Sequence, residues 1–131
     1  MTGPARSIAV AALVVADYDA ARDWYVEKLG FSVLADTDQG GGKRWLVVGV
    51  EGGARLLLAK AADEAQAARI GDQAGGRVAF FLQTDDFARD HAAMLSKGVV
   101  FKEQPRHEPY GSVAVFADLY GNLWDLIQYK A

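Results

Sequence analysis

Short apolar runs alternate along the chain with polar turns and with segments of helical periodicity. The first run, residues 8–16, is rich in β-branched and aliphatic residues and predicts a strand. In residues 19–29 the apolar positions recur at three- and four-residue intervals, which predicts an amphipathic helix. Asp17 is placed to cap this helix, because its carboxylate can accept from the first-turn amides, and Gly30 is placed to end it.

Three further strand patterns follow this helix. Residues 31–35 predict a strand, and the glycine-rich residues 39–42 predict a mobile loop at the mouth of a pocket. Residues 44–50 and 55–60 flank a Glu-Gly-Gly turn and predict a hairpin. The first part of the chain therefore has the expected order strand, helix, strand, strand, strand.

The second part of the chain predicts the same order of elements. Either Asp85 or Asp86 caps its helix, which we expect to extend to Lys97 and to end at Gly98. Its strands are expected at residues 78–84, 99–103, 112–117 and 122–129.

The two parts align without a gap at an offset of 68 residues (78 − 10). The offset superposes Val10 on Val78, Asp17 on Asp85, Gly30 on Gly98 and Leu58 on Leu126. Such a match predicts a duplication. We expect a single domain over residues 1–131, with a βαβββ module at 8–60, a linker at 61–76 and a second module at 77–131. The predicted fold is α+β, with both modules forming one eight-stranded, cup-shaped mixed sheet and the helices outside.

Composition narrows the class of protein. With 131 residues, 51% of them apolar and 24% charged, the chain has the composition of one globular domain. The net charge of −3 gives no sign of a nucleic-acid or membrane partner, and the absence of cysteine excludes disulfides and thiolate metal sites. The N-terminal apolar run is too short to span a bilayer and has no clear cleavage site. We therefore expect a cytoplasmic protein.

Two segments, VVADYDAARDWYVEKLGF (14–31) and FADLYGNLWDLIQ (116–128), carry a resemblance to a known family. They resemble the vicinal oxygen chelate superfamily, which includes glyoxalase I, extradiol dioxygenases and the fosfomycin- and bleomycin-resistance proteins. The likeness extends from Ile8 to Tyr129 and implies the cup-shaped fold. It leaves the activity open, because this superfamily hosts many chemistries.

The resemblance also implies where a metal ion would bind. The family's metal enzymes place a His or Gln on the first strand of each half and a Glu on the last strand of each half. The matching positions of this chain are Val10, Val78, Leu57 and Asp125. A catalytic divalent ion needs about three protein ligands with nitrogen or oxygen donors, and three of these four side chains offer none. We expect no metal and no other cofactor.

Asp125 has two interpretations. If it points into the cup, its carboxyl is poorly solvated, and it can contact a ligand's amine or act as a base. Otherwise it is an inherited remnant, satisfied by water or by Arg44, which is itself a candidate ligand contact. His91 is expected to be a structural residue at the edge of the core. His107 and Tyr110 lie in a loop near the rim, where His107 either contacts a ligand or is solvated.

Strand parity assigns the large side chains to faces of the sheet. If residue 117 pairs with residue 122, Phe80 and Phe116 share the face of Asp125 and become candidate ligand contacts. The residues assigned to the core are Trp45, Trp124 and Leu126.

Three functions remain open. The first is a metal-free homodimer, similar to bleomycin-resistance proteins, that binds a small apolar or aromatic antibiotic or metabolite. The second is a lyase or isomerase of the glyoxalase type that uses Asp125 and His107 with no metal or an atypical one. The third is a structural or regulatory dimer with a filled cup. The apolar side chains at three of the four ligand positions favour the first.

Overall fold

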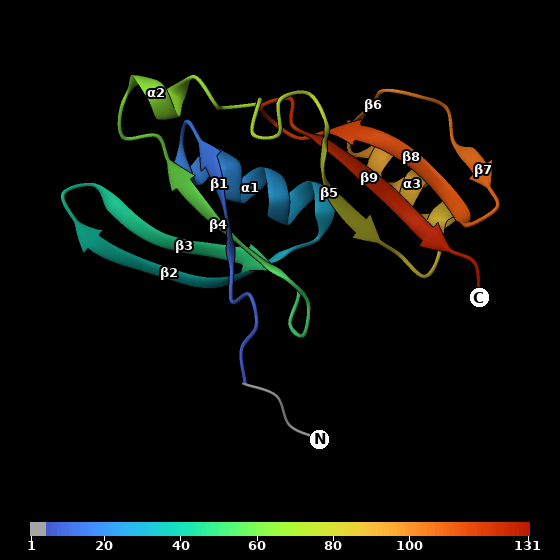
Figure 1. Cartoon of the computed structure of the whole chain (residues 1–131), viewed down its shortest axis with the longest axis horizontal. Coiled ribbons are helices and arrows are strands. Elements are labelled where there is room, and N and C mark those ends of the chain that lie inside the picture. Colours follow the sequence, from blue (N-terminus) through green and yellow to red (C-terminus); the bar gives the residue numbers. More distant parts are fainter. Residues whose placement is uncertain (1–4) are drawn as a thin grey trace.

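The computed structural model describes residues 5–131, which form two mixed sheets lying side by side, each with a helix packed on one face (Figure 1). Sheet A has the order β1-β4-β3-β2, and only its β1–β4 pair is parallel. Its strands are β1 (Ala11–Val15), β2 (Ser32–Gly40), β3 (Lys43–Gly49) and β4 (Arg55–Lys60), and its helix is α1 (Tyr18–Leu29).

Sheet B repeats this arrangement with one additional short strand. It has the order β5-β9-β8-β6, with β7 also paired to β8, and its β5–β9 pair is parallel. Its strands are β5 (Val78–Gln83), β6 (Val100–Phe101), β7 (Arg106–Glu108), β8 (Gly111–Ala117) and β9 (Leu123–Tyr129). Its helix is α3 (Phe87–Ser96), and a short helix α2 (Glu64–Ala67) lies between the two sheets in the sequence. The α+β fold with two βαβββ modules is confirmed.

Both long helices begin where side-chain caps satisfy their first amides. Asp17 accepts a 2.7 Å hydrogen bond from the Ala20 amide, and Gly30 adopts φ 72° at the end of α1, both as expected. At α3 the choice between two aspartates is settled, because the Asp86 carboxylate accepts from the Arg89 amide at 3.0 Å.

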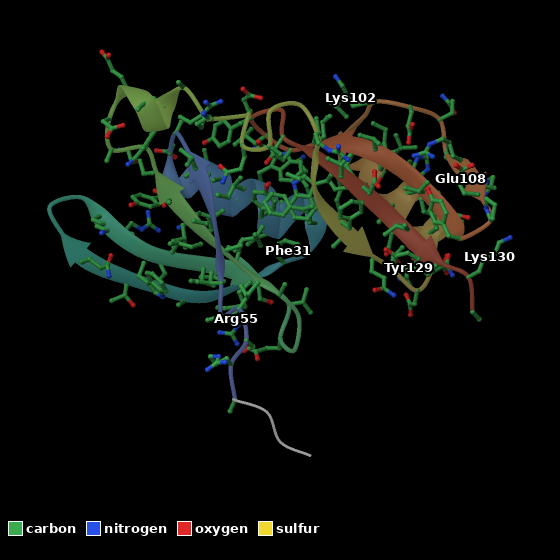
Figure 2. The ribbon with its side chains drawn as sticks, viewed as in Figure 1. Phe31, Arg55, Lys102, Glu108, Tyr129 and Lys130 are labelled. Atoms are coloured by element: carbon green, nitrogen blue, oxygen red, sulfur yellow. The ribbon has the colours of Figure 1, made fainter. Side chains whose placement is uncertain are left out.

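Alternation along the strands separates a helix side from a cup face, which we define as the face of each sheet opposite its helix. On the helix side, one apolar cluster extends across both modules. It includes Leu46, Val48, Leu56 and Leu58 of sheet A and Phe116, Trp124 and Leu126 of sheet B. The aromatic rings of Tyr25, Phe31 and Trp124 meet where the two modules join, and Figure 2 shows Phe31 at this junction. The prediction that Trp124 and Leu126 belong to the core is confirmed.

The glycine-rich segment is a tight turn and not a loop. Strand β2 continues to Gly40, and β3 starts at Lys43, so that Gly41 and Gly42 alone connect the two strands. The expected end of β2 at residue 35 was too early, because the alternating polar residues that follow are compatible with an exposed edge strand.

Strand β6 is shorter than predicted. Its pairing with β8 ends after Phe101, and the Glu103 carboxylate instead accepts a 3.0 Å hydrogen bond from the Val115 amide. A side chain thus replaces a backbone carbonyl at this edge, and pairing with β8 resumes at Arg106. Hydrogen bonds join strands within each sheet, but within residues 5–131 none of the strand pairs joins sheet A to sheet B.

Candidate functional site

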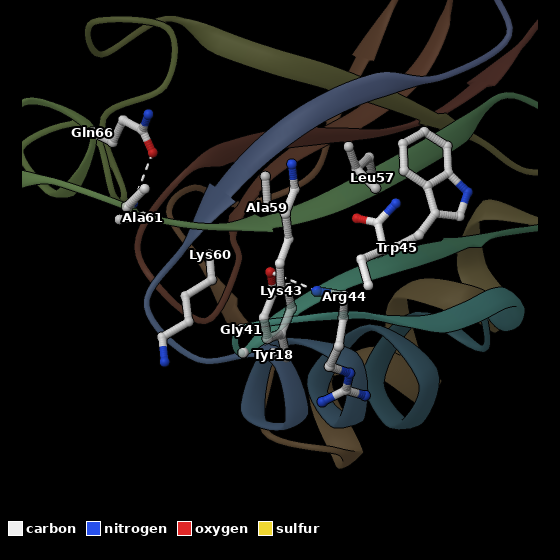
Figure 3. A pocket seen from close by; sticks show the side chains of 13 residues that line it. Tyr18, Gly41, Lys43, Arg44, Trp45, Leu57, Ala59, Lys60, Ala61 and Gln66 are labelled. Atoms are coloured by element: carbon white, nitrogen blue, oxygen red, sulfur yellow. Dashed lines mark hydrogen bonds between the residues drawn. The ribbon is translucent and has the colours of Figure 1, made fainter.

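A cavity of about 690 Å³ opens at the edge of sheet A, between the end of the β2–β3 hairpin and the start of the linker that carries α2 (Figure 3). This volume lies within the range of small-molecule sites, about 300–1,000 Å³. Its lining residues are Tyr18, Gln39, Gly41, Gly42, Lys43, Arg44, Trp45, Leu57, Ala59, Lys60, Ala61, Ala62 and Gln66.

The apolar part of the lining comes from the cup face of β3 and β4. Because Leu46 and Leu58 are buried toward α1, their neighbours Trp45, Leu57 and Ala59 point to the other side of the sheet. Figure 3 shows the indole of Trp45 beside Leu57. The Trp45 side chain is 39% exposed, so the expectation that it belongs to the core was wrong. An exposed indole above aliphatic residues can stack with a flat ring.

Arg44 points to the helix side of the same strand and is held there. Its guanidinium donates two hydrogen bonds to Asp36, at 3.1 and 2.8 Å, and one to Asp19 at 2.7 Å. Its hydrogen bonds hold the pKa of Asp19 and the pKa of Asp36 below the usual range. Arg44 also lies over the Tyr18 ring, 5.1 Å from the centroid, and its backbone amide donates to Tyr18 Oη at 3.2 Å. It lines the cavity, but its charge is already neutralised.

Asp125 lies on the cup face of sheet B, opposite Val115 on β8 and Phe81 on β5. Its Oδ1 atom is buried without a hydrogen-bond partner among the described residues. Burial raises the pKa of Asp125, the charge of Arg106 acts to lower it, and the charge of Glu103 acts to raise it.

Arg106 does not neutralise Asp125, because its guanidinium is hydrogen-bonded to two other carboxylates. Its Nε contacts both oxygens of Glu103 at 3.1 Å, and its Nη1 donates to Glu108 at 3.1 Å. Neither this group nor Asp125 lines the cavity of sheet A. The alternative in which Arg44 satisfies Asp125 does not hold, because Arg44 pairs with Asp19 and Asp36.

The face predicted for two phenylalanines was wrong by one residue of register. Ala117 pairs with Leu123, and not with residue 122, so that Phe116 lies opposite Trp124. Phe80 also lies on the helix side, with its ring 4.7 Å from that of Trp124, because β5 has a bulge between Val78 and Phe80. Phe81 takes the place beside Asp125 and is 62% exposed.

The two histidines and Tyr110 also lie outside the cavity of sheet A. His91 packs between Phe87 and Phe101, with ring centroids 5.5 and 4.5 Å away, in the structural position expected of it. His107 Nδ1 lies 2.9 Å from Ser112 Oγ. Ser112 and Asp125 occupy positions of opposite parity along the β8–β9 ladder, so His107 and Asp125 do not face one site. Tyr110 is exposed at the β7–β8 turn.

The positions that correspond to a metal site do not fit a divalent ion. Val10, Leu57 and Val78 carry no donor atoms, and within residues 5–131 no three His, Asp or Glu side chains gather where they could hold a metal. In the same part of the chain, no helix combines the length and apolar character needed to cross a bilayer.

Sequence reasoning missed the cavity residues Lys43, Trp45 and Tyr18. A signal for them was present: Lys43 and Trp45 are two positions apart on β3 and share one face of the strand, and one register places this face on the cup side with Leu57. The other register is equally compatible with the sequence, and only the pairing with β4 decides between them.

Comparison with known proteins agrees with this architecture. A protein of Shewanella frigidimarina (strain NCIMB 400) is 54% identical over 94% of this chain and 93% of its own length, and its printed name is "Uncharacterized protein". The crystal structure of TnmS3, an antibiotic binding protein from Streptomyces sp. CB03234, is similar with a TM-score of 0.79 and 30% identity over 98% of this chain and 100% of that chain. A glyoxalase/bleomycin resistance protein from the same strain has a TM-score of 0.72 and 33% identity over 93% of this chain and 100% of its own.

The family assignment follows from a match over most of the length. The family model described as the Glyoxalase/Bleomycin resistance protein/Dioxygenase superfamily matches residues 7–126. With the βαβββ modules and the similar structures, this match identifies the chain as a member of that superfamily.

Proposed function

We propose that the protein binds a small, flat apolar or aromatic molecule, an antibiotic or a metabolite, without a metal ion. The observation that carries this proposal is the cavity of about 690 Å³ on sheet A, which is lined by an exposed indole, Trp45, together with Leu57 and Ala59. The similarity to an antibiotic-binding protein at 30% identity over the whole chain supports the same class of ligand.

The physical basis is burial of aromatic surface. A flat ring placed on the indole removes apolar area from water on both partners, at about 25 cal/mol per Å². Stacking adds about 0.5–1.5 kcal/mol beyond this burial. The donor-free side chains of Val10, Leu57 and Val78 support a binding mode that needs no metal ion.

We propose that the protein acts as a cytoplasmic homodimer. Each sheet of a single chain leaves a large apolar side chain exposed on its cup face, Trp45 on sheet A and Phe81 on sheet B. A second copy that covers these side chains would also enclose the cup faces, and Phe81 and Asp125 would then contribute to the ligand site. Light scattering after size exclusion tests the dimer, and a monomeric mass at micromolar concentration contradicts it.

The binding proposal is tested with protein purified without chelator. We expect no stoichiometric divalent ion by elemental analysis, and we expect flat aromatic antibiotics and metabolites to raise the melting temperature by an amount that grows with the logarithm of ligand concentration above the Kd. Trp45→Ala should abolish the shift, whereas Trp24→Phe, which alters a partly buried indole of α1, should retain it. A bound stoichiometric metal, or a ligand shift that survives Trp45→Ala, contradicts the proposal.

A second candidate function rests on Asp125. A carboxyl with a raised pKa and an unpartnered oxygen is suited to proton transfer, as in a lyase or isomerase of the family. His107 cannot assist it at one site, because it lies on the other face of the sheet. Retention of any discovered turnover in Asp125→Asn excludes this role.

A further inference from the structure

The charged residues that line the cavity of sheet A are all basic. They are Lys43, Arg44 and Lys60, and none of the 17 acidic residues of the chain lines it, although the net charge is −3. Arg44 is neutralised by Asp19 and Asp36. Within residues 5–131 no ion pair involves Lys43 or Lys60, so the cavity keeps an excess of positive charge.

Lys43 is the lysine best placed to meet a ligand that stacks on Trp45. The two residues are separated by one position on β3 and therefore point to the same face, about 6–7 Å apart along the strand. Figure 3 shows the Lys43 side chain extending past Ala59, whereas Lys60 extends to the other side of the strand. An anionic substituent on a ring stacked over Trp45 falls within reach of the Lys43 amine.

Tyr18 adds a neutral hydrogen-bond donor to the same cavity. Its Oη accepts a 3.2 Å hydrogen bond from the Arg44 backbone amide. Among the described residues, no acceptor takes a hydrogen bond from the Tyr18 hydroxyl proton. A phenol lining a cavity with its proton available favours an acceptor group on the ligand. Lys43 thus favours an anionic group on the ligand, whereas Tyr18 favours a hydrogen-bond acceptor of either charge state.

We infer that the ligand is a flat aromatic molecule with an anionic substituent, a carboxylate, sulfonate or phosphate, whose ring stacks on Trp45 and whose anion pairs with Lys43. This inference rests on the proposed function and adds the charge of the ligand to it. Because Lys43 is solvent-accessible, the preference for the anion is that of one exposed ion pair, about 1.5- to fivefold in affinity.

Three probes of equal ring size separate charge from stacking. They are 1-naphthoate, 1-naphthalenemethanol and 1-naphthylmethylammonium, titrated by calorimetry and by tryptophan fluorescence in 20 mM and 500 mM NaCl. We expect 1-naphthoate to bind about 1.5- to fivefold more tightly than the neutral alcohol, the ammonium probe to bind most weakly, and the preference to shrink at high salt. Trp45→Ala should remove the binding of all three.

Two variants with the same change in net charge locate the effect. Lys43→Gln should equalise the affinities for 1-naphthoate and 1-naphthalenemethanol and leave the alcohol's affinity unchanged. Lys130→Gln, an exposed position that does not line the cavity, should keep the full preference.

The outcomes distinguish this inference from the proposed function. Equal binding of the three probes, or a preference that persists in Lys43→Gln, overturns the inference and leaves the aromatic site standing. If no probe binds in a Trp45-dependent way, the proposed function fails and the inference fails with it.

Discussion

The phenol of Tyr25 donates a 2.5 Å hydrogen bond to Asp118 Oδ2, across 93 residues of sequence. Both side chains are buried, and the bond ties helix α1 of the first module to the β8–β9 turn of the second. The same carboxylate accepts from the backbone amides of Tyr120 and Asn122 and from the Asn122 side chain. Burial, together with the charge of Asp118, raises the pKa of Tyr25, so the phenol remains a donor throughout the stable pH range.

Tyr25→Phe should therefore destabilise the protein without changing its fold. Removing a donor to a buried carboxylate costs about 1.5–3 kcal/mol, because the oxygen keeps its desolvation penalty but loses a partner. Urea unfolding monitored by circular dichroism measures the change.

The matched control for this variant is Tyr129→Phe, which removes a hydroxyl from a half-exposed ring. It should change the free energy of unfolding by no more than about 0.5 kcal/mol. Equal effects of the two substitutions would mean that the Tyr25–Asp118 bond contributes nothing specific.

The sequence alone predicts the elements well because their signals are local. Asp17 caps its helix through an amide three residues away, and Trp124 and Leu126 reach the core together because they are two positions apart on β9 and share one face. The resemblance adds the fold, since it fixes the order of the strands in each module.

Register and long-range pairing are what sequence could not supply. Phe116 changed face because one residue of slip in the β8–β9 turn reverses every side chain of a strand, and Trp45 changed face for the same reason. Glu103 completes the edge of β8 with its side chain, which no local pattern indicates. The cavity depends on these choices, so its lining was missed.

The face assignment on sheet B can be tested by two phenylalanine truncations. Phe116 is 0% exposed, and its ring lies against those of Trp124 and Phe101, so Phe116→Ala should cost about 3–5 kcal/mol. Phe81→Ala, on the cup face, should cost about 1 kcal/mol or less in a monomer. Chemical denaturation at a protein concentration below any dimer dissociation constant gives both losses of unfolding free energy. A larger loss for Phe81→Ala than for Phe116→Ala would mean that Phe116 lies on the cup face.

Arg44 holds Asp36 and Asp19 together through a set of hydrogen bonds, a clamp that only an arginine side chain can form. Arg44→Lys retains the charge but loses the two parallel bonds to Asp36 and the bond to Asp19, so we expect a loss of about 0.5–1 kcal/mol. The loss should also loosen Tyr18, because the guanidinium lies over its ring. Thermal unfolding with and without 0.5 M NaCl measures the effect. Lys130→Arg is a control of the reverse exchange at an exposed position, and a larger effect there would argue against the clamp.

Asp125 should give the protein a pH dependence opposite to that of an ion-paired aspartate. Its pKa is raised in the folded state, so the native protein binds this proton more readily than the unfolded chain does. Ionised Asp125 therefore costs stability above its folded-state pKa, and this cost disappears as the pH falls through that pKa toward the ordinary value.

Asp125→Asn should consequently stabilise the protein at pH 7, and its advantage over the wild type should shrink as the pH is lowered through the folded-state pKa of Asp125. Asp36→Asn should change the stability at pH 7 in the opposite direction, because Arg44 lowers the pKa of Asp36 and the ionised form of Asp36 stabilises the fold. That variant should be less stable than the wild type at pH 7, with the difference lost as the pH falls below the ordinary aspartate range toward the lowered pKa. Urea midpoints measured from pH 3 to 8 for the wild type and both variants test the two signs. Parallel curves for the wild type and Asp125→Asn would show that Asp125 ionises in the folded protein as it does in water, and its buried Oδ1 would then have to be solvated in solution.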